Sequence, residues 1–387
     1  MWVRLLHLSV TMIVAKAAES PLWVRLQTPV SSKHSPLGTR LEAVVVQPFH
    51  GALSIPMGTR LSGKVLATSS KRPSSIRFSF ESISMGGREV PLKTRVVDVD
   101  NSRERVAPDG TVVGLDELRK RPGKVELLLL LAAHAHPLVL ASLEVTKLAL
   151  REIERPEVSY PVGTDVGLAI EDFPKDIPNT APDPEVLVSD GPLVQIFGEL
   201  PDRAQAKHPP VPSDWVNLAF LGTQQSLDQA FHAAGWQTAE ELSLRTEART
   251  FFAVAENHAY QRAPVSILLI GGRKPDVVYQ KQNNTFAKRH HIRIWSTDRT
   301  WQGQPVWIAA ATHDIGIDFS KQARTFTHRV DSDVDLERSK VVSDLGVAGR
   351  ISSVTLLIRP SVPAASQNAT GDQIHTDGRL AVLTLQP

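Results

Sequence analysis

The N-terminal half of the chain alternates apolar and polar residues in short runs that break at glycine and proline. A two-residue period of this kind is typical of half-buried β-strands. The sequence therefore predicts an all-β domain over residues 18–170, folded as a barrel or a sandwich. Its expected strands include residues 22–26, 41–46, 60–66, 76–80 and 90–97.

A short repeat, Pro-x-Gly-Thr, punctuates these strands at residues 36–39, 56–59 and 161–164. Proline presets φ for the first turn position, and glycine accepts a positive φ at the second. Each repeat is therefore expected to form a tight turn from which a strand starts at the threonine. These turns resemble those in the β-domains of VirB10/TrbI-type conjugation proteins, and the resemblance implies an exported domain in an envelope setting.

The pattern changes after residue 170. Residues 171–213 hold nine of the 27 prolines, a density that favours extended chain over helix or central strand. We therefore predict a Pro-rich linker here, with one short strand at residues 193–197.

Residues 214–387 mix strand-like alternation with helical periodicity, which predicts an α+β domain with a mixed or antiparallel sheet. Helices are expected at residues 224–234 and 333–345, the second capped by Ser332 and ended by Gly346. Strands are expected at residues 216–221, 265–270, 291–295, 306–311 and 325–330, and near 354 and 380. The fold class is thus two domains, the first all-β and the second α+β.

The first residues have the features of a secretory signal peptide. Arg4 precedes an apolar run over residues 5–14, and the small residues Ala15 and Ala17 stand at the cleavage positions. Residues 1–17 are therefore predicted to be removed on export, which places the mature chain in the periplasm or outside the cell. The chain contains no cysteine, which suits an oxidising compartment.

A leucine-rich stretch at residues 125–150 has the apolar content of a membrane span but carries Glu126, Glu144 and Lys147. Each charge near a bilayer centre costs about 2.5–3.5 kcal/mol. A buried helix broken or kinked at Pro137 is the favoured interpretation. No stable transmembrane span is expected after signal cleavage.

The charge balance argues against a nucleic-acid partner. Lysine and arginine number 43, aspartate and glutamate 41, and the formal net charge is +2. Proteins that bind nucleic acid carry a basic patch or stripe instead. The expected partner class is an anionic lipid or another envelope component.

The candidate chemistry is concentrated between residues 289 and 335, where four of the 13 histidines lie. Histidine can bind a metal or move a proton near neutral pH. Side chains on a strand alternate between its faces. His290 is therefore expected on the face opposite to a group that comprises Arg289, His291, Arg293 and Trp295.

The following strand, at residues 306–311, is expected to pair with this one across a turn at residues 298–303. The pairing brings His313 and Asp314 to the open end beside the histidines. Small residues at 309–311 leave room there for a ligand.

Two chemistries fit these residues. In the first, a divalent cation, Zn²⁺ or Mn²⁺, carries a hydroxide that hydrolyses an ester. Its ligands come from a set that comprises His290, His291, His313, His328 and Asp331. In the second, a histidine acts as general acid or nucleophile on a phosphoryl group held by arginines, without a metal.

The predicted site residues fall into three groups. The catalytic group comprises His290, His291, Arg293, His313 and Asp314. The substrate-binding group comprises Arg273, Arg289, Trp295 and Arg338. The metal-binding group comprises His313, His328 and Asp331.

A series of motifs over residues 214–387 resembles the LssY C-terminal domain family. The series runs Gly272-Arg273-x-x-Asp276, Arg289-His290-His291-x-Arg293-x-Trp295, His313-Asp314, His328-Arg329-x-Asp331-x-Asp333-x-Asp335 and Thr376-Asp377-Gly378-Arg379. Some relatives carry this domain after DedA-like membrane segments and a PAP2-type lipid-phosphatase domain. The resemblance implies an envelope setting and a role in lipid-phosphate metabolism.

Two hypotheses for the function follow. The first is an exported hydrolase of phosphoesters, with envelope lipid phosphates as the substrate class. The second is a non-catalytic envelope protein for binding or assembly that recognises an anionic lipid, a glycan or a protein partner. Convergence of three or more of the five candidate metal ligands on one centre would favour the enzyme.

Overall fold

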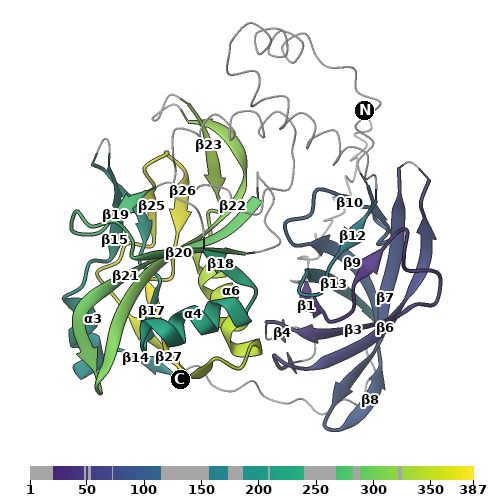
Figure 1. Ribbon diagram of the computed structural model, residues 1–387, viewed down its shortest axis with the longest axis horizontal. Helices are drawn as coiled ribbons and strands as arrows, with labels where there is room; N and C mark the ends of the chain where they lie inside the picture. The colour runs from purple at the N-terminus through teal and green to yellow at the C-terminus, as the bar shows by residue number, and fades with distance from the viewer. Residues whose placement is uncertain are drawn as a thin grey trace, which may run out of the picture.

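The computed structural model describes residues 21–47, 49–50, 54–71, 73–114, 157–172, 186–207, 210–238, 267–281, 288–320 and 325–387. They form two β-rich units that lie side by side (Figure 1). The predicted signal peptide, the stretch at residues 125–150 and the first part of the predicted linker lie outside the described residues. In the described part of the chain, none of the helices has the length and apolar content needed to cross a bilayer.

The N-terminal unit is all-β, as predicted, and its main sheet curls into a nearly closed barrel. The strands follow the order β10-β11-β7-β6-β3-β1-β13-β9, with β8 paired to β7. Thr94 of β9 closes the curl by exchanging hydrogen bonds of 2.8 and 2.9 Å with the backbone of Phe80 in β7. The strands are β1 (Leu22–Leu26), β3 (Arg40–Val45), β6 (Arg60–Ser69), β7 (Ser75–Met85), β8 (Arg88–Pro91), β9 (Lys93–Val99), β10 (Arg105–Val106), β11 (Val112–Val113) and β13 (Asp165–Asp172).

Two short antiparallel pairs flank this sheet. They are β2 (Val30–Ser31) with β12 (Ser159–Tyr160), and β4 (Phe49–His50) with β5 (Ser54–Ile55). The apolar positions of the predicted alternation point inward and form one core. Burial of that core is what specifies the register of the strands.

All three Pro-x-Gly-Thr repeats form tight turns, in which the proline is the first residue and the following residue and the glycine take the two central positions. Gly38, Gly58 and Gly163 have φ of 83°, 84° and 92°, values that glycine adopts without steric cost. In each turn the threonine N–H donates to the carbonyl of the proline three residues earlier. The strands β3, β6 and β13 begin one residue after the threonine.

The C-terminal unit is an α+β fold around a sheet of mixed direction, which confirms the predicted class. The sheet follows the order β14-β24-β27-β17-β22-β21-β20-β18, with β23 paired to β22. The pairs β17–β27 and β14–β24 are parallel. The strands are β14 (Leu187–Val188), β17 (Leu218–Leu221), β18 (Trp236–Thr238), β20 (Val277–Lys281), β21 (Lys288–Trp301), β22 (Gln304–Ser320), β23 (Thr325–Val330), β24 (Ile351–Ile358) and β27 (Arg379–Leu385).

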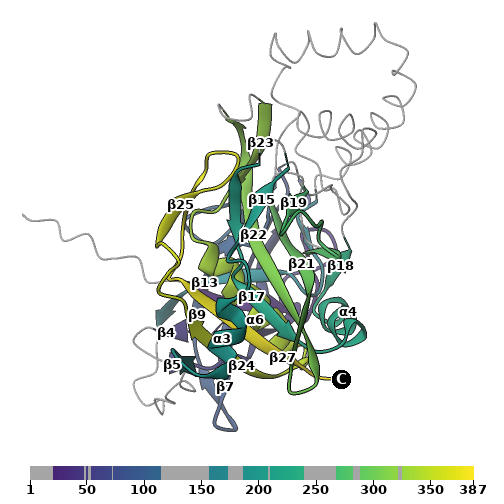
Figure 2. The same ribbon diagram turned by 90° about the vertical axis from the view of Figure 1, so that its left-hand side faces the viewer.

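Helices α4 (Gln224–Ala233) and α6 (Val334–Val347) confirm the two predicted helices, and both pack on one face of this sheet. The opposite face is covered by α3 (Pro192–Gly198) and by a small sheet of β16 (Pro212–Trp215), β15 (Arg203–Ala206) and β19 (Leu268–Leu269). A hairpin of β25 (Ala365–Gln367) and β26 (Gln373–His375) completes the unit. Figure 2 shows β17, β22 and β21 side by side.

The ends of α6 differ from the prediction. Asp333, rather than Ser332, caps the helix, because its carboxylate accepts a hydrogen bond of 3.1 Å from the backbone of Asp335. Gly346 lies inside the helix instead of ending it. A β-carbon at Gly346 would come within 2.9 Å of the Met57 methyl group, so the glycine allows the N-terminal unit to approach closely.

The predicted linker is wrong where the structure describes it. Residues 186–207 and 210–213 belong to the C-terminal unit, and residues 193–197 form part of α3 rather than a strand. Pro192 occupies the start of that helix, where the missing N–H costs no hydrogen bond. Among the described prolines of this region, Pro192 starts α3 and Pro212 starts the edge strand β16.

Candidate functional site

The predicted pairing of β21 with β22 is confirmed. The chain reverses at Gln302 and Gly303, which have φ of 49° and 78°. The register places three pairs of site residues opposite one another: His290 with His313, His291 with Thr312, and Arg289 with Asp314. Because neighbouring side chains point to opposite faces, the first pair lies on one face of the sheet and the other two lie on the reverse face.

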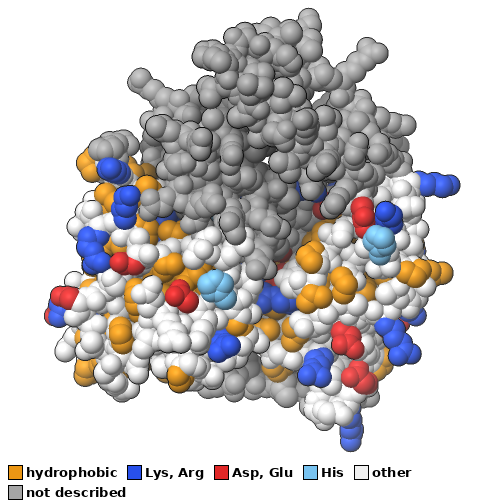
Figure 3. Space-filling model, in the orientation of Figure 1, with side chains coloured by type: hydrophobic (Ala, Val, Ile, Leu, Met, Phe, Trp, Pro, Cys, Tyr) orange, Lys and Arg blue, Asp and Glu red, His pale blue; other side chains and the backbone are white. Residues whose placement is uncertain are grey.

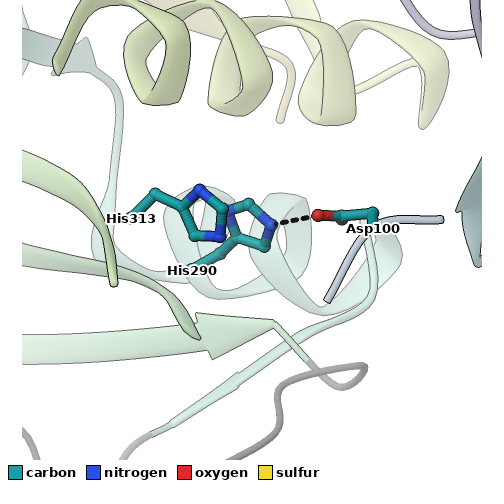
Figure 4. Close-up of side chains that lie close together, drawn as sticks. All are labelled: Asp100, His290 and His313. Carbon is teal, nitrogen blue, oxygen red and sulfur yellow. Dashed lines mark hydrogen bonds and ion pairs between the residues drawn. The ribbon is translucent and has the colours of Figure 1, made fainter. Parts of the chain in front are cut away.

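The His290 face is built jointly by the two units. His290 and His313 stack with ring centroids 4.0 Å apart and planes at 16°. The two nitrogens of His290 lie 2.8 Å from Asp100 and 2.7 Å from Glu337 of α6. His313 Nε2 lies 3.1 Å from Asn101 Oδ1. Asp100 and Asn101 directly follow β9 of the N-terminal unit, and Figure 4 shows Asp100 reaching His290.

The two histidines of this face hold different charges. Burial disfavours the charged form of His290, but attraction by Asp100 and Glu337 outweighs it and raises the pKa to about 9. Burial, and then the charge on His290, hold the pKa of His313 well below its usual range. A neutral imidazole therefore stacks on an imidazolium whose two N–H groups donate to carboxylates.

The ligand atoms of Asp100, His290 and His313 lie within 4.8 Å of one another, a spacing that could surround an ion. The detailed geometry does not fit a metal. Ligand atoms about 2.1 Å from a tetrahedral ion lie about 3.4 Å apart, and each imidazole points at the ion in its ring plane. Here the rings lie face to face, and the 2.8 Å contact between His290 and Asp100 has the length of a hydrogen bond. In this structure His290 and Asp100 are joined to each other by a hydrogen bond.

The three predicted metal ligands are not brought together. His313 belongs to the His290 face. His328 of β23 lies on the reverse face, with Nδ1 3.7 Å from Asp314 Oδ2. Asp331 precedes α6 and accepts a hydrogen bond of 3.1 Å from the backbone of Asp333.

The reverse face gathers a second buried group of polar side chains. Arg289 donates through Nε and Nη2 to Asp314 Oδ2 over 3.1 and 3.0 Å. Arg293 donates to Asp214 Oδ2 over 2.9 Å. His291 lies between them on β21. Each of these five residues is buried.

His291 lies between a hydroxyl group and a carboxylate. Its Nε2 is 2.9 Å from Thr312 Oγ1, and its Nδ1 is 3.7 Å from Asp314 Oδ2. Within the described residues, His291 Nδ1 makes no hydrogen bond. Burial, followed by the charges of Arg293 and Arg289, holds the pKa of His291 well below its usual range. Burial raises the pKa of Asp314 to about 6 against the opposing effect of Arg289. The imidazole of His291 is therefore neutral, and the two arginines disfavour its protonated form.

The predicted substrate-binding residues are spread over the C-terminal unit. Arg289 lies in the second buried group, and the indole of Trp295 donates to the Arg273 carbonyl over 3.2 Å. The Arg273 side chain is exposed and donates to Ser296 Oγ over 3.1 Å. Arg338 lies elsewhere, held by two 2.8 Å hydrogen bonds to Asp377.

Sequence reasoning missed several residues that complete the two faces. Asp100 and Asn101 are about 190 residues or more from their histidine partners, so no local pattern points to them. Asp214 likewise meets Arg293 only in the fold. Thr312 had a signal, because strand alternation places it on the same face as Asp314.

Comparison with known proteins identifies part of the chain. Residues 198–380 match the family model described as LssY C-terminus. No curated protein and no solved structure matches the chain. The family match includes both faces of β21 and β22 but leaves out Asp100 and Asn101. It does not reach the Pro-x-Gly-Thr turns, and their resemblance to VirB10/TrbI-type proteins is not shown.

Proposed function

We propose that the C-terminal domain of this chain, in which residues 198–380 match the LssY C-terminus family model, is a hydrolase of phosphoesters. The proposal is carried by His291, a neutral imidazole with Nε2 2.9 Å from the Thr312 hydroxyl and Nδ1 facing the Asp314 carboxylate at 3.7 Å, which is longer than a hydrogen bond. A hydroxyl, a base and an orienting carboxylate in this order form the arrangement by which hydrolases activate a nucleophile. Arg289 and Arg293 lie beside it.

The proposed hydrolysis would use these side chains and no metal. His291 accepts the proton of Thr312 Oγ1 as that oxygen bonds to phosphorus and the bond to the ester oxygen breaks. His291 then returns the proton to the departing alkoxide. Water, activated by His291, releases phosphate from Thr312. The arginines supply positive charge for the anionic phosphoryl group.

We propose an exported setting for this activity, with envelope lipid phosphates as its substrates. Support for the setting comes from the predicted signal peptide at residues 1–17 and from the absence of cysteine in the sequence. Support for the substrate class comes from the family resemblance and from the paired arginines. The mature protein would act in the periplasm or outside the cell.

One observation favours the non-catalytic hypothesis as a second candidate. Arg289 and Arg293 are each already paired with a carboxylate, and Thr312 is 2% exposed. Ion pairs of this kind also stabilise a fold without doing chemistry. The C-terminal unit would then serve an envelope protein that recognises an anionic lipid, a glycan or a protein partner through other surfaces.

Phosphate release by the full chain tests the hydrolase proposal. The substrates are p-nitrophenyl phosphate and vesicles of phosphatidic acid. Thr312→Val keeps the side-chain shape and removes the hydroxyl, and His291→Gln removes the base. Each is expected to lower kcat by about 100-fold or more. The matched control is His232→Gln, at an exposed histidine of α4, which is expected to leave the rate unchanged.

The outcomes separate the two functions. Full activity in Thr312→Val would show that Thr312 is not the nucleophile. No turnover of either substrate by the wild-type chain would refute the hydrolase proposal. Vesicle binding by a chain without turnover would support the binding protein.

A further inference from the structure

A pocket of about 370 Å³ opens on the face of the C-terminal sheet that α3 covers. Its volume lies within the range of small-molecule sites, about 300–1,000 Å³. Figure 2 shows α3 in front of β17, β24 and β27, and these strands form the floor of the pocket. Trp301, at the far end of β21, forms part of the lining. A strand rises about 3.3 Å per residue, so the pocket lies about 30 Å along β21 from His291.

Four short side chains keep the floor of the pocket open. The register of β24 and β27 places Ser353 opposite Thr384 and Thr355 opposite Val382. Strand alternation turns all four toward the side of Leu357, which packs in the core beneath α3. Because these side chains are short, they leave the space between the sheet and α3 unfilled, where larger residues would extend the core.

Three hydroxyl groups on this floor can bond to a ligand. Ser353 donates to Thr384 Oγ1 over 3.0 Å. Each hydroxyl has one donor hydrogen and two acceptor sites, so Thr384 still has a donor and both residues still have acceptor sites. Thr355 adds a third hydroxyl on the same face. The floor therefore both donates and accepts hydrogen bonds.

An apolar wall stands beside the hydroxyls. Trp301 is half-buried and packs against the core beneath α3, as does Leu193 in the first turn of that helix. Both residues also line the pocket. A half-buried indole offers a rigid, flat apolar surface to whatever enters.

A carboxylate and an amide lie at the lip. Gly191, with φ of 96°, turns the chain from β14 into α3 and leaves Asp190 exposed beside the pocket. Gln302 lies across from it in the two-residue turn between β21 and β22, with φ of 49°. Asparagine, aspartate or glycine is preferred at such a turn position. The chain carries a longer amide there, and that amide borders the pocket.

The charge of the lining restricts the class of ligand. Among the described residues, no lysine, arginine or histidine lines the pocket, and Asp190 is its one charged group. An anionic ligand would meet a like charge and no cation. A wholly apolar ligand would leave the hydroxyls without partners. In the space-filling view, hydrophobic and uncharged surface prevails at the lower end of the C-terminal unit, around β14 and β27 (Figure 3).

A pyranose ring has the complementary chemistry. Its C–H bonds form an apolar face that can lie against an indole, and its hydroxyls point outward as donors and acceptors. We propose that this pocket binds a pyranose unit of a glycan that carries no negative charge. One face of the sugar lies on Trp301, and its hydroxyls bond to the floor and to Asp190. The proposal does not depend on the hydrolase, because the pocket shares no residue with either histidine-bearing face of β21 and β22.

Saturation-transfer difference NMR on the full chain tests the proposal, because it detects weak binding and shows which sugar protons contact the protein. The probes are the neutral disaccharides maltose, cellobiose, lactose and chitobiose, followed by glucose, glucosamine and glucuronate. The last three share one ring and differ in charge. We expect at least one neutral disaccharide to bind, with the strongest signals on the C–H protons of one ring face. Glucosamine should bind at least as tightly as glucose, and glucuronate about tenfold more weakly.

Four variants assign the contacts. Trp301→Ala should raise the Kd by about tenfold or more, and Trp301→Phe, which keeps an aromatic face, should lose less. Thr384→Val keeps the shape and removes a hydroxyl, so it should weaken binding of every sugar. Asp190→Asn should abolish the preference for glucosamine over glucuronate. The matched control is Asp298→Asn, at a side chain that is 90% exposed and outside the pocket, and it should bind like the wild type.

Several results would overturn the glycan site. One is no signal from any of the sugars with the wild-type chain. Another is an unchanged Kd in Trp301→Ala that keeps the circular dichroism of the wild type. Tighter binding of glucuronate than of glucose would contradict the charge argument, and tighter binding of choline than of any sugar would assign the pocket to a quaternary ammonium group. If Trp301→Ala does not fold, Asp190→Asn still decides, since Asp190 is exposed and its readout is a change of preference.

Discussion

Replacing Asp344 by asparagine tests how much the buried ion pairs of Asp344 stabilise the protein. Asp344 has no exposed surface. Its carboxylate accepts hydrogen bonds from Arg25, from Lys281 over 2.6 Å and from the indole of Trp236 over 2.8 Å. Asparagine keeps the shape but has one acceptor oxygen, and its amide N–H groups would point at donors. The substitution also leaves one buried positive charge without compensation.

The magnitude follows from the number of partners that Asp344 serves. Removing one partner of a buried ion pair costs about 3–5 kcal/mol. Burial lowers the pKa of Lys281 to about 8 even with Asp344 present, so losing that attraction lowers it further. Lys281 would then release its proton as pH rises, and the uncompensated charge would disappear. We expect Asp344→Asn to lower the free energy of unfolding by about 4 kcal/mol at pH 6, and by less at pH 9.

Urea unfolding of the full chain, followed by circular dichroism and by tryptophan fluorescence, measures this change. Asp298→Asn is the matched control, since the Asp298 side chain is 90% exposed. It should change the free energy of unfolding by less than about 0.5 kcal/mol. A loss below about 1 kcal/mol for Asp344→Asn at pH 6 would refute the reasoning, because it lies well under the cost of a broken buried pair. A loss that is equal at pH 6 and pH 9 would refute the part assigned to Lys281.

Two further predictions concern packing and backbone conformation. The Phe231 ring stacks on Tyr279 at 4.4 Å between centroids and meets Trp236 edge-on. Phe231→Ala should therefore lower the free energy of unfolding, measured by heat or urea, by about 3–5 kcal/mol. A loss under about 1 kcal/mol would contradict the packing described. Gly38→Ala should cost about 1–2 kcal/mol because φ is 83° there although no atom lies within 4 Å. The control is Gly198→Ala at the end of α3, where the space is equally open and φ is not positive. It should not lower the free energy of unfolding. Equal losses in the two variants would show that φ is not the cause.

The elements that the sequence predicted well are those whose signals are local. The three Pro-x-Gly-Thr turns depend only on preferences within one four-residue motif, and all three formed. Helix α4 follows from its apolar stripe, which includes Leu227 and Phe231. The alternation of β21 likewise fixed which of His290 and His291 faces which side.

The wrong predictions concern residue types that can play more than one structural role, depending on the tertiary structure. Proline can mark an extended linker, a helix start or an edge strand, and Pro192 starts α3. Glycine can end a helix or allow another residue to approach the helix closely, and Gly346 allows Met57 to do so. Ser332 and Asp333 are both good caps, and the structure uses Asp333.

The sequence by itself determined the longer strands, the Pro-x-Gly-Thr turns, helices α4 and α6 and the segment that carries the candidate chemistry, because each depends on neighbours within a few residues. Only the tertiary structure decided which of those residues meet. His290 acquires Asp100 as its partner across 190 positions of the chain, while His291, one residue away, faces Thr312 and Asp314 on the other side of the sheet. The pKa of a buried histidine depends on the charges within a few ångströms of its ring. Those charges are supplied by the packing of two separate units, which no periodicity along the chain encodes.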